Sequence, residues 1–265
     1  MSCPHCGPSS ATGDTAVQEC TGRNGVHVEP TILLVGNPNV GKSTVFNLIT
    51  GARQAVVNAP GTTVEVAVGR SARTGARVVD MPGTYSLVAQ SPDEQVVVDT
   101  LAAAEGSFTD PSSGRDVDLV VCVLDATALT RSLYLLAQVA RTGRPMVALV
   151  TLDDIAESEG EGTDISALAS TLGIPVMVVD PRNHKVRASV EDFLARGLAL
   201  RPRLVGIDPN PLAPGENAEE LFDWVERTEG TLGRAEADSA RMSRSDRIDR
   251  ILLNPWLGIP VIIAT

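Results

Sequence analysis

The sequence is poor in aromatic side chains, which make up 3% of its 265 residues. The core must therefore be built from Val, Leu, Ile and Ala. Hydrophobic residues make up 43% and charged residues 21%. This balance is typical of a globular chain and excludes a disordered one. The length allows one full-sized domain and a smaller second unit.

Positive charge is also scarce, and the formal net charge is -11. An acidic surface repels a phosphate backbone, which argues against nucleic acid as the main partner. A small nucleotide remains compatible, because backbone N–H groups can bind phosphate locally. Lys42 and Lys185 are the only lysines. A lysine retained among arginines suggests a need for a compact point charge.

No basic start followed by an apolar stretch opens the sequence, so a reducing cytosolic compartment is expected. Cys122 lies in an apolar run and is predicted to be an inert core thiol. Residues 1–30 are predicted to be a flexible leader that contains Cys3, Cys6 and Cys20. Cys3 and Cys6 have C-x-x-C spacing, which is half of a zinc signature, so a metal site and a plain tail both stay open.

Apolar runs alternate with amphipathic segments along most of the chain. Strands are predicted over residues 31–36, 77–83, 118–127, 145–154 and 174–180, and helices over 43–51, 132–143, 164–173 and 186–200. This alternation predicts an α/β fold with a mainly parallel sheet and helices on both faces. The motif GNPNVGKS (36–43) makes the predicted fold that of a P-loop NTPase. Ligands on such sheets bind at the carboxyl ends of the strands.

The segment GNPNVGKS (36–43) matches the phosphate-loop pattern G-x-x-x-x-G-K-S between a predicted strand and a predicted helix. Its glycines allow backbone N–H groups to point at the β-phosphate. Lys42 is expected to reach the β- and γ-phosphates, and the Ser43 hydroxyl to coordinate Mg²⁺. The predicted phosphate contacts are Gly36, Asn37, Pro38, Asn39, Val40, Gly41, Lys42, Ser43 and Thr44.

The segment DMPG (80–83) fits the D-x-x-G element of GTPases at a strand end. Asp80 is expected to hold the Mg²⁺ shell through water, and the Gly83 N–H to contact the γ-phosphate. Met81 and Pro82 lie between them and complete this part of the predicted nucleotide site.

Residues 58–69 are predicted to form the mobile switch between these two motifs. Thr63 is the predicted second hydroxyl ligand of Mg²⁺, with Thr62 as its competitor. A Thr-rich strand is the structural alternative, and both can hold at once. The residue after Gly83 is Thr84 rather than the usual water-orienting Gln. Slow intrinsic hydrolysis, or another means of stabilising charge, is therefore implied.

These motifs resemble the FeoB family of bacterial ferrous iron transporters. The segments that carry the resemblance are GNPNVGKSTVFNLITG, NAPGTTVE, DMPGTYSL, SPDEQVVVD, DATALTRSLYLLAQV and RIDRILLNPWLGIP, in that order. They cover about residues 31–199 and 243–260. The resemblance implies Mg²⁺-dependent GTP hydrolysis coupled to Fe²⁺ uptake, at the cytoplasmic face of the bacterial membrane. It also implies the protein's own membrane region, small accessory Feo proteins and a second copy of the chain as partners.

The resemblance further implies a K⁺ ion beside the phosphates, held by Asn39. That K⁺ would substitute for an arginine finger, since the Gln is missing. The plain alternative is that Asn39 only shapes the loop.

The base-recognition segments depart from the family pattern. The strand ends in TLDD (151–154), where the family usually has N-x-x-D. Asp154 is the predicted guanine-binding carboxylate, with Asp153 as runner-up. Thr151 stands in the Asn position, and its hydroxyl can replace part of the link from the base loop to the phosphate loop.

The base-backing loop reads VDPR (179–182) rather than S-A-K or S-A-R. Asp180, Pro181 and Arg182 are the predicted base contacts, but Pro181 has no N–H to offer guanine O6. Weaker guanine affinity or relaxed base choice is one hypothesis, and a plain turn is the other.

The resemblance divides the chain into the leader, a GTPase domain (31–202), a helical spacer (203–250) and the start of a truncated membrane segment (251–265). Helices are predicted within the spacer over 218–230 and 239–253. A buried C-terminal helix or strand is the alternative for the last segment, which is shorter than the ~20 residues that span a bilayer.

Two other functions are compatible with the motifs. One is a nucleotide-responsive binding module with little turnover, because the base motifs are altered and the Gln is missing. The other is a soluble assembly GTPase, which would need a basic RNA-binding appendage that the acidic balance does not favour.

Overall fold

The computed structural model describes residues 29–51, 54–58, 64–88, 91–102, 116–160, 162–210 and 213–232. Several predictions fall outside these ranges and are not addressed by the structure. They concern the leader with Cys3, Cys6 and Cys20, the candidate Mg²⁺ ligands Thr62 and Thr63, the helix over 239–253 and the segment 251–265.

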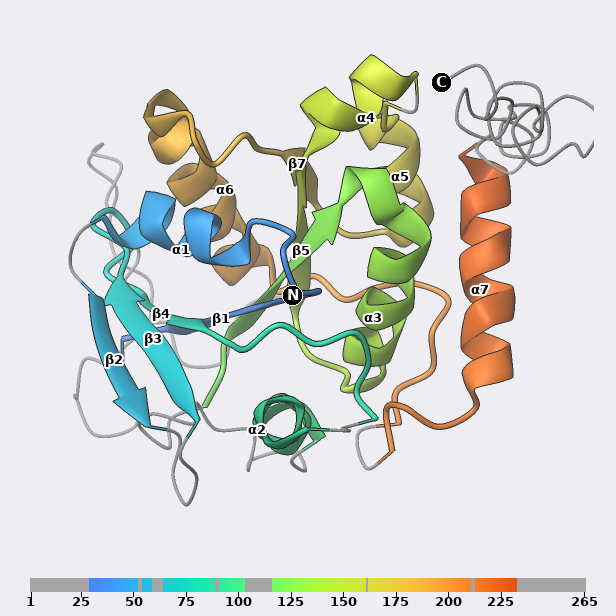
Figure 1. The fold of residues 1–265 in the computed structure, drawn as a ribbon, viewed down its shortest axis with the longest axis horizontal. Coiled ribbons are helices and arrows are strands. Elements are labelled where there is room, and N and C mark those ends of the chain that lie inside the picture. The colour runs from blue at the N-terminus through green and yellow to red at the C-terminus, as the bar shows by residue number, and fades with distance from the viewer. Residues whose placement is uncertain are drawn as a thin grey trace, which may run out of the picture.

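A seven-stranded sheet in the order β2-β3-β4-β1-β5-β6-β7 forms the centre of the molecule (Figure 1). The strands are β1 (Thr31–Gly36), β2 (Gln54–Asn58), β3 (Glu65–Arg70), β4 (Arg77–Asp80), β5 (Leu119–Asp125), β6 (Met146–Thr151) and β7 (Val176–Val178). The five strands from β4 to β7 in this order are parallel, while β3 pairs antiparallel with both β2 and β4. The predicted mainly parallel sheet is confirmed, with an antiparallel hairpin added at one edge.

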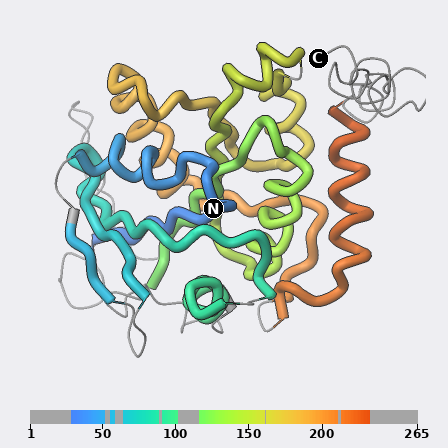
Figure 2. The backbone as a smooth tube through the Cα atoms, in the orientation of Figure 1, coloured from blue at the N-terminus to red at the C-terminus, as the bar shows by residue number. Residues whose placement is uncertain are grey.

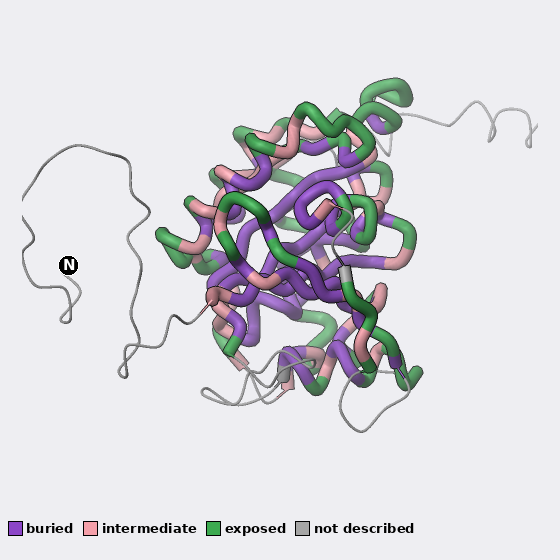
Figure 3. Tube along the Cα trace, turned by 90° about the vertical axis from the view of Figure 1, so that its left-hand side faces the viewer, coloured by how far each residue is buried: buried purple, intermediate pink, exposed green. Residues whose placement is uncertain are grey.

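Helices cover both faces of the sheet. They are α1 (Lys42–Thr50), α2 (Pro92–Ala102), α3 (Leu129–Arg141), α4 (Asp153–Glu159), α5 (Ile165–Leu172), α6 (Arg187–Leu200) and α7 (Ala218–Thr231), with short 3-10 turns at Ala126–Ala128 and His184–Val186. Ile32 and Leu34 pack with α1 and α6, while Leu33 and Val35 pack with α2, α3 and α5. This alternation along β1 explains why the central strands are apolar throughout and buried (Figure 3).

The helix predicted over 218–230 is present as α7, and it packs on α3 and α5 rather than standing apart (Figure 2). Leu221, Trp224 and Val225 of α7 belong to the same buried cluster as the α3 core. At the edge of this contact the Phe222 ring stacks on Tyr134, with centroids 4.5 Å apart. The first helix of the predicted spacer therefore packs directly on the α/β domain.

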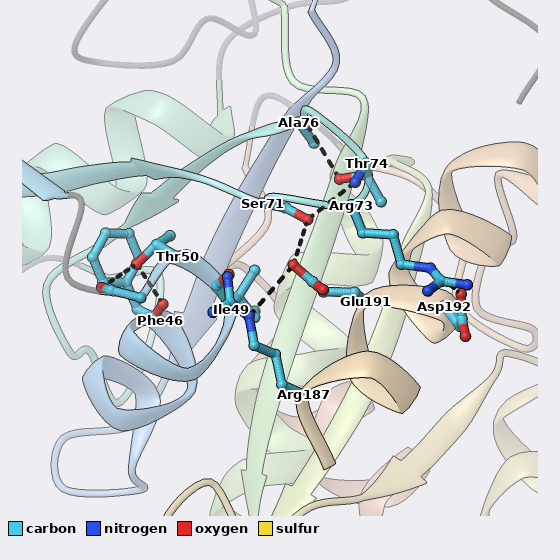
Figure 4. Close-up of polar contacts among 11 residues, drawn as sticks. Phe46, Ile49, Thr50, Ser71, Arg73, Thr74, Ala76, Arg187, Glu191 and Asp192 are labelled. Carbon is cyan, nitrogen blue, oxygen red and sulfur yellow. Dashed lines mark hydrogen bonds and ion pairs between the residues drawn. The ribbon is translucent and has the colours of Figure 1, made fainter. Parts of the chain in front are cut away.

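A buried polar cluster joins α6 to α1 and to the β3–β4 turn (Figure 4). Glu191 is 5% exposed and accepts a hydrogen bond from Ser71 Oγ at 3.1 Å. Arg187 forms an ion pair with Glu191 at 3.7 Å and donates to the Ile49 carbonyl oxygen, at the end of α1, at 2.9 Å. Arg73 in the same turn pairs with Asp192 at 2.6 Å. The Arg187 contacts fix the end of α1 against α6, whereas the Arg73 pair joins only the β3–β4 turn to α6.

The structure corrects the strand predicted over 145–154. β6 ends at Thr151, Leu152 has a positive φ of 60°, and α4 begins at Asp153. A left-handed residue breaks the extended backbone, so the two aspartates lie in the first turn of a helix. Helix α2 and hairpin strand β2 were not predicted, whereas β3 agrees with the strand alternative for residues 58–69. Within the described ranges no helix is both long and apolar enough to cross a membrane.

Candidate functional site

The turn between β1 and α1 forms one wall of a cavity of about 500 Å³. Gly41 has a φ of 83° and Asn39 a φ of 65°, so the loop curls back on itself through two left-handed residues. Asn tolerates this conformation better than most residues, which supports a loop-shaping role for Asn39. The cavity is lined by Asn37, Pro38, Asn39, Gly41, Lys42, Ser43, Thr44 and Gly83.

Lys42 lies at the base of this cavity and is 8% exposed. Its Nζ forms an ion pair with Asp80 Oδ1 at 2.6 Å and also donates to the Met81 carbonyl oxygen. Asp80, at the end of β4, is equally buried. The predicted lysine and aspartate therefore meet, and each neutralises the other's charge away from water.

Gly83 lies against the phosphate loop. A Cβ added at Gly83 would lie 2.9 Å from Pro38 Cα and 3.0 Å from Pro38 N. The next residue, Thr84, donates its N–H to the Gly36 carbonyl oxygen at 3.3 Å. Only glycine permits this close backbone approach, which brings the D-x-x-G segment to the cavity wall.

Two features of the cavity bear on the ligand that it can bind. Asn37 is 5% exposed, and its Oδ1 has no hydrogen-bond partner within the described part of the chain. This oxygen is an acceptor, so it suits a hydrogen-bond donor rather than an anion. The second feature is the concave, glycine-containing turn ahead of α1, which exposes backbone N–H groups.

Thr151 connects the base loop to the phosphate loop. Its side chain is completely buried, and Oγ1 lies 2.6 Å from the Val40 carbonyl oxygen and 3.1 Å from that of Leu124. A hydroxyl has a single proton to donate, so the shorter contact with Val40 is the main hydrogen bond. The predicted partial replacement of the family's Asn by a threonine hydroxyl is present in this geometry.

Replacing Thr151 with valine is expected to lower both the melting temperature and the affinity for nucleotide. Valine keeps the shape of threonine but removes the donor to the Val40 carbonyl, which costs about 1–3 kcal/mol at a buried site. Thermal unfolding and nucleotide titration of Thr151→Val beside Thr151→Ser measure the effect. Serine keeps the hydroxyl, so equal losses in the two variants would contradict a role for this hydrogen bond.

The second loop cluster lies where β6 and β7 end. Arg182 Nη2 donates to Asp154 Oδ2 at 2.7 Å, and Nε donates to Asp180 Oδ1 at 2.8 Å. The hydrogen bond from Arg182 lowers the pKa of Asp180, and both aspartates raise the pKa of Arg182. Asp153 turns elsewhere and accepts the Thr163 N–H at 3.1 Å. Asp154 rather than Asp153 therefore faces the base-backing loop.

The two loop clusters are neighbours. A Cβ added at Gly41 would lie 3.9 Å from Pro181 Cγ, and Thr151 links the base loop to Val40. Gly36 and Val40 are buried behind the cavity wall, and Pro82 is partly exposed beside Gly83. Apart from Thr63, which lies outside the described residues, all the predicted site residues lie in the phosphate cavity, the adjoining D-x-x-G segment (80–83) or the base loops.

One buried residue near the site was missed by the sequence analysis. Gln138 of α3 is fully buried, and its Oε1 accepts the Leu87 N–H at 2.8 Å. It therefore holds the segment that follows Gly83. A single glutamine inside an amphipathic helix offers no sequence signal for this role. Cys122 is buried as predicted, and burial raises the pKa of its thiol.

Comparisons with known proteins agree with this geometry. The family model described as "Ferrous iron transport protein B" matches residues 30–193. The Fe(2+) transporter FeoB of Salmonella typhimurium is 41% identical over 165 residues, and that of Escherichia coli strain K12 is 39% identical over 165 residues. The match covers 60% of this chain but only 20% of either relative.

Solved structures of the same family share the fold. The cytosolic domain of L. pneumophila FeoB superposes with a TM-score of 0.61 and 28% identity, covering 76% of this chain and 98% of that domain. An S. thermophilus NFeoB mutant bound to GDP gives a TM-score of 0.59 and 26% identity, covering 80% of this chain and 94% of that one. Since the family model covers more than half of its residues, this chain belongs to the family of ferrous iron transport protein B.

Proposed function

We propose that this chain binds GTP in the cavity between the phosphate loop and Gly83 and hydrolyses it. The observation that carries the proposal is the convergence of Lys42, Asp80 and Gly83 on one cavity at the end of β1. GDP bound to the S. thermophilus relative supports a guanine nucleotide as the ligand. Lys42 would exchange its contact with Asp80 for the β- and γ-phosphate oxygens.

The remaining roles follow from position. Backbone N–H groups of residues 36–44 would surround the β-phosphate, and the Gly83 N–H would contact the γ-phosphate. The oxygens of Ser43 and Asp80 suit Mg²⁺, a cation that prefers oxygen ligands. Bound there, Mg²⁺ would neutralise charge on the phosphate oxygens. Thr63 remains the proposed second hydroxyl ligand, and Asp154 the proposed acceptor of the guanine N1 and N2 hydrogens.

GTP hydrolysis is expected to be slow unless another group stabilises the charge that develops on the phosphates. Thr84 stands where a water-orienting glutamine is usual, and its side chain is fully buried. Its hydroxyl already donates a hydrogen bond to the Ser86 carbonyl oxygen at 2.6 Å. This observation favours the second candidate function, a nucleotide-responsive module with little turnover, unless K⁺ held by Asn39 supplies the missing charge stabilisation.

Phosphate release under saturating GTP, in K⁺ and in Na⁺ buffers, separates these functions. We expect release about tenfold or more faster in K⁺, as one added charge stabiliser near the transferred phosphoryl group can supply. Equal rates in the two salts would remove the K⁺ role. Tight GTP binding with no phosphate release in either salt would indicate that the chain is a nucleotide-responsive binding module.

Asn39→Gly tests the cation role without disturbing the loop. Glycine adopts the positive φ of residue 39 at no steric cost but removes the amide oxygen. The K⁺ stimulation should therefore disappear while nucleotide affinity remains. If Asn39→Gly keeps its stimulation by K⁺, the residue only shapes the loop.

Coupling to iron uptake is proposed from family membership, since the chain matches 20% of the relatives' length. In this proposal the chain works at the cytoplasmic face of the membrane, attached to its own membrane region. Accessory Feo proteins and a second copy of the chain are the other proposed partners.

The segment that follows Gly83 lies against the linker to the proposed spacer. A Cβ added at Gly215 would lie 3.1 Å from the Leu87 carbonyl oxygen, so the linker lies against this segment. Arg141 of α3 then holds the start of α7 through Glu220, at 2.6 Å, and through the Glu216 carbonyl oxygen. We therefore expect a movement near Gly83 to displace the linker and, through the linker, the start of α7.

A further inference from the structure

Arg182 joins the two loops that form the proposed base site. Its side chain is 61% exposed, yet it contacts Asp154 at the start of α4 and Asp180 after β7 at the same time. These two ion pairs use one N–H on Nη2 and the single N–H on Nε. A guanidinium carries five N–H groups in a planar fork, so three remain available beside the Asp154 carboxylate.

Two successive backbone positions of this loop, 181 and 182, offer no free donor for the exocyclic oxygen of guanine. Pro181 has no N–H. The N–H of Arg182 itself donates to Asp180 Oδ1 at 3.1 Å. A guanine placed with N1 and N2 on Asp154 would therefore find no backbone donor for O6 at residues 181 and 182, which costs affinity.

We propose that the Arg182 guanidinium recognises guanine O6 and so makes the site select guanine over adenine. The proposal rests on the proposed nucleotide-binding function and assigns the selectivity to one side chain. Asp154 accepts from the guanine N1–H and N2–H, and the adjacent Arg182 fork donates to O6. Asp180 holds that fork in place by accepting from Nε.

Adenine presents the opposite pattern to the same two groups. Its exocyclic amino group is a donor and would face the Arg182 donors, while its N1 is an acceptor and would face the Asp154 carboxylate. Each mismatched pair leaves polar groups without partners, and a site built to bond one pattern rejects the other. Because Arg182 is well exposed, solvent moderates the effect, and we expect about a tenfold contribution to selectivity.

The test is equilibrium binding of GDP, IDP and ADP to the full chain and to Arg182→Ala, measured by calorimetry. IDP keeps O6 and the N1–H of guanine but lacks the N2 amino group. Loss of Arg182 should weaken GDP and IDP by the same factor, about tenfold, and leave ADP unchanged or slightly stronger. The ratio of GDP to ADP affinity should fall by about the same factor.

Arg73→Ala is the matched control, since Arg73 also forms an exposed ion pair, with Asp192, away from the base loops. It should change no nucleotide affinity. Three results would overturn the proposal. Stronger GDP binding by Arg182→Ala would show that Arg182 competes with the base for Asp154. An equal loss of ADP and GDP would indicate stacking or loop support instead of O6 recognition. Wild-type protein that binds GDP no better than ADP would refute the Arg182 claim while leaving the proposed hydrolase function intact.

Failure of the proposed function has a different signature. In that case wild-type protein would bind none of the three nucleotides, and both claims would fall together.

Discussion

Replacing Lys42 with alanine is expected to weaken GTP binding and slow hydrolysis by at least about 100-fold each, because the cavity loses a preorganised charge aimed at the phosphates. The variant should also be less stable. Asp80 is 8% exposed and would lose its cationic partner, and an uncompensated buried charge costs about 3–5 kcal/mol. Nucleotide titration, phosphate release and thermal unfolding measure the three effects.

Two further variants separate binding from folding. Lys42→Met combined with Asp80→Asn removes both charges, so stability should largely return while nucleotide binding does not. Lys185→Ala removes the other lysine, which is exposed and does not line the phosphate cavity, and should bind nucleotide normally. Nucleotide affinity retained by Lys42→Ala would contradict the assignment of the phosphate site.

Adding a single methyl group at Gly83 should reduce hydrolysis about 100-fold, the scale expected when reacting groups are displaced by about 1 Å. The new Cβ in Gly83→Ala would lie 2.9 Å from Pro38 Cα. A backbone atom cannot move aside as a flexible side chain can, so the segment around Gly83 must shift away from the phosphate loop. GDP affinity should change little, because the Gly83 N–H is assigned to the γ-phosphate.

Gly230→Ala adds the same methyl group in α7, where no atom lies within 4 Å. It should leave hydrolysis unchanged and slightly stabilise the helix. Single-turnover phosphate release and GDP titration on both variants test whether the methyl group acts through its contact with the phosphate loop. Full activity in Gly83→Ala would mean that this glycine is not pressed against the phosphate loop in the active state.

The cavity at the predicted phosphate loop could be predicted from sequence because its geometry is local. Between a strand and a helix, the spacing of Gly36, Gly41 and Lys42 is enough to place N–H groups and an ammonium around a phosphate. The contact of Lys42 with Asp80 also follows, since parallel neighbours β1 and β4 end at the same edge of the sheet. Burial of Cys122 could be predicted for a similarly simple reason, an uninterrupted apolar strand.

Helix α2 was missed for a physical reason. The consecutive valines 96–98 have low helix propensity and read as a strand or loop. The useful signal was at its start. Ser91 Oγ accepts the Glu94 N–H at 3.2 Å, and Pro92 occupies the first helical position, an arrangement favoured at helix N-termini.

The base site could be predicted only in part, because it is assembled from loops distant in sequence. The hydrogen bond from Thr151 to Val40 spans 111 residues, and that from Arg182 to Asp154 spans 28. Neither can be read from local spacing. The end of β6 depends on a left-handed Leu152. Leucine rarely adopts this conformation, so the sequence gives no sign of it.

Calorimetric titration of the full chain with GDP and GTP in the presence of Mg²⁺ tests the central claim most directly. The account predicts saturable binding of a single nucleotide per chain, lost in Lys42→Ala and retained in Lys185→Ala. Folded protein that shows no binding heat with guanine or adenine nucleotides, even at millimolar concentration, would contradict it.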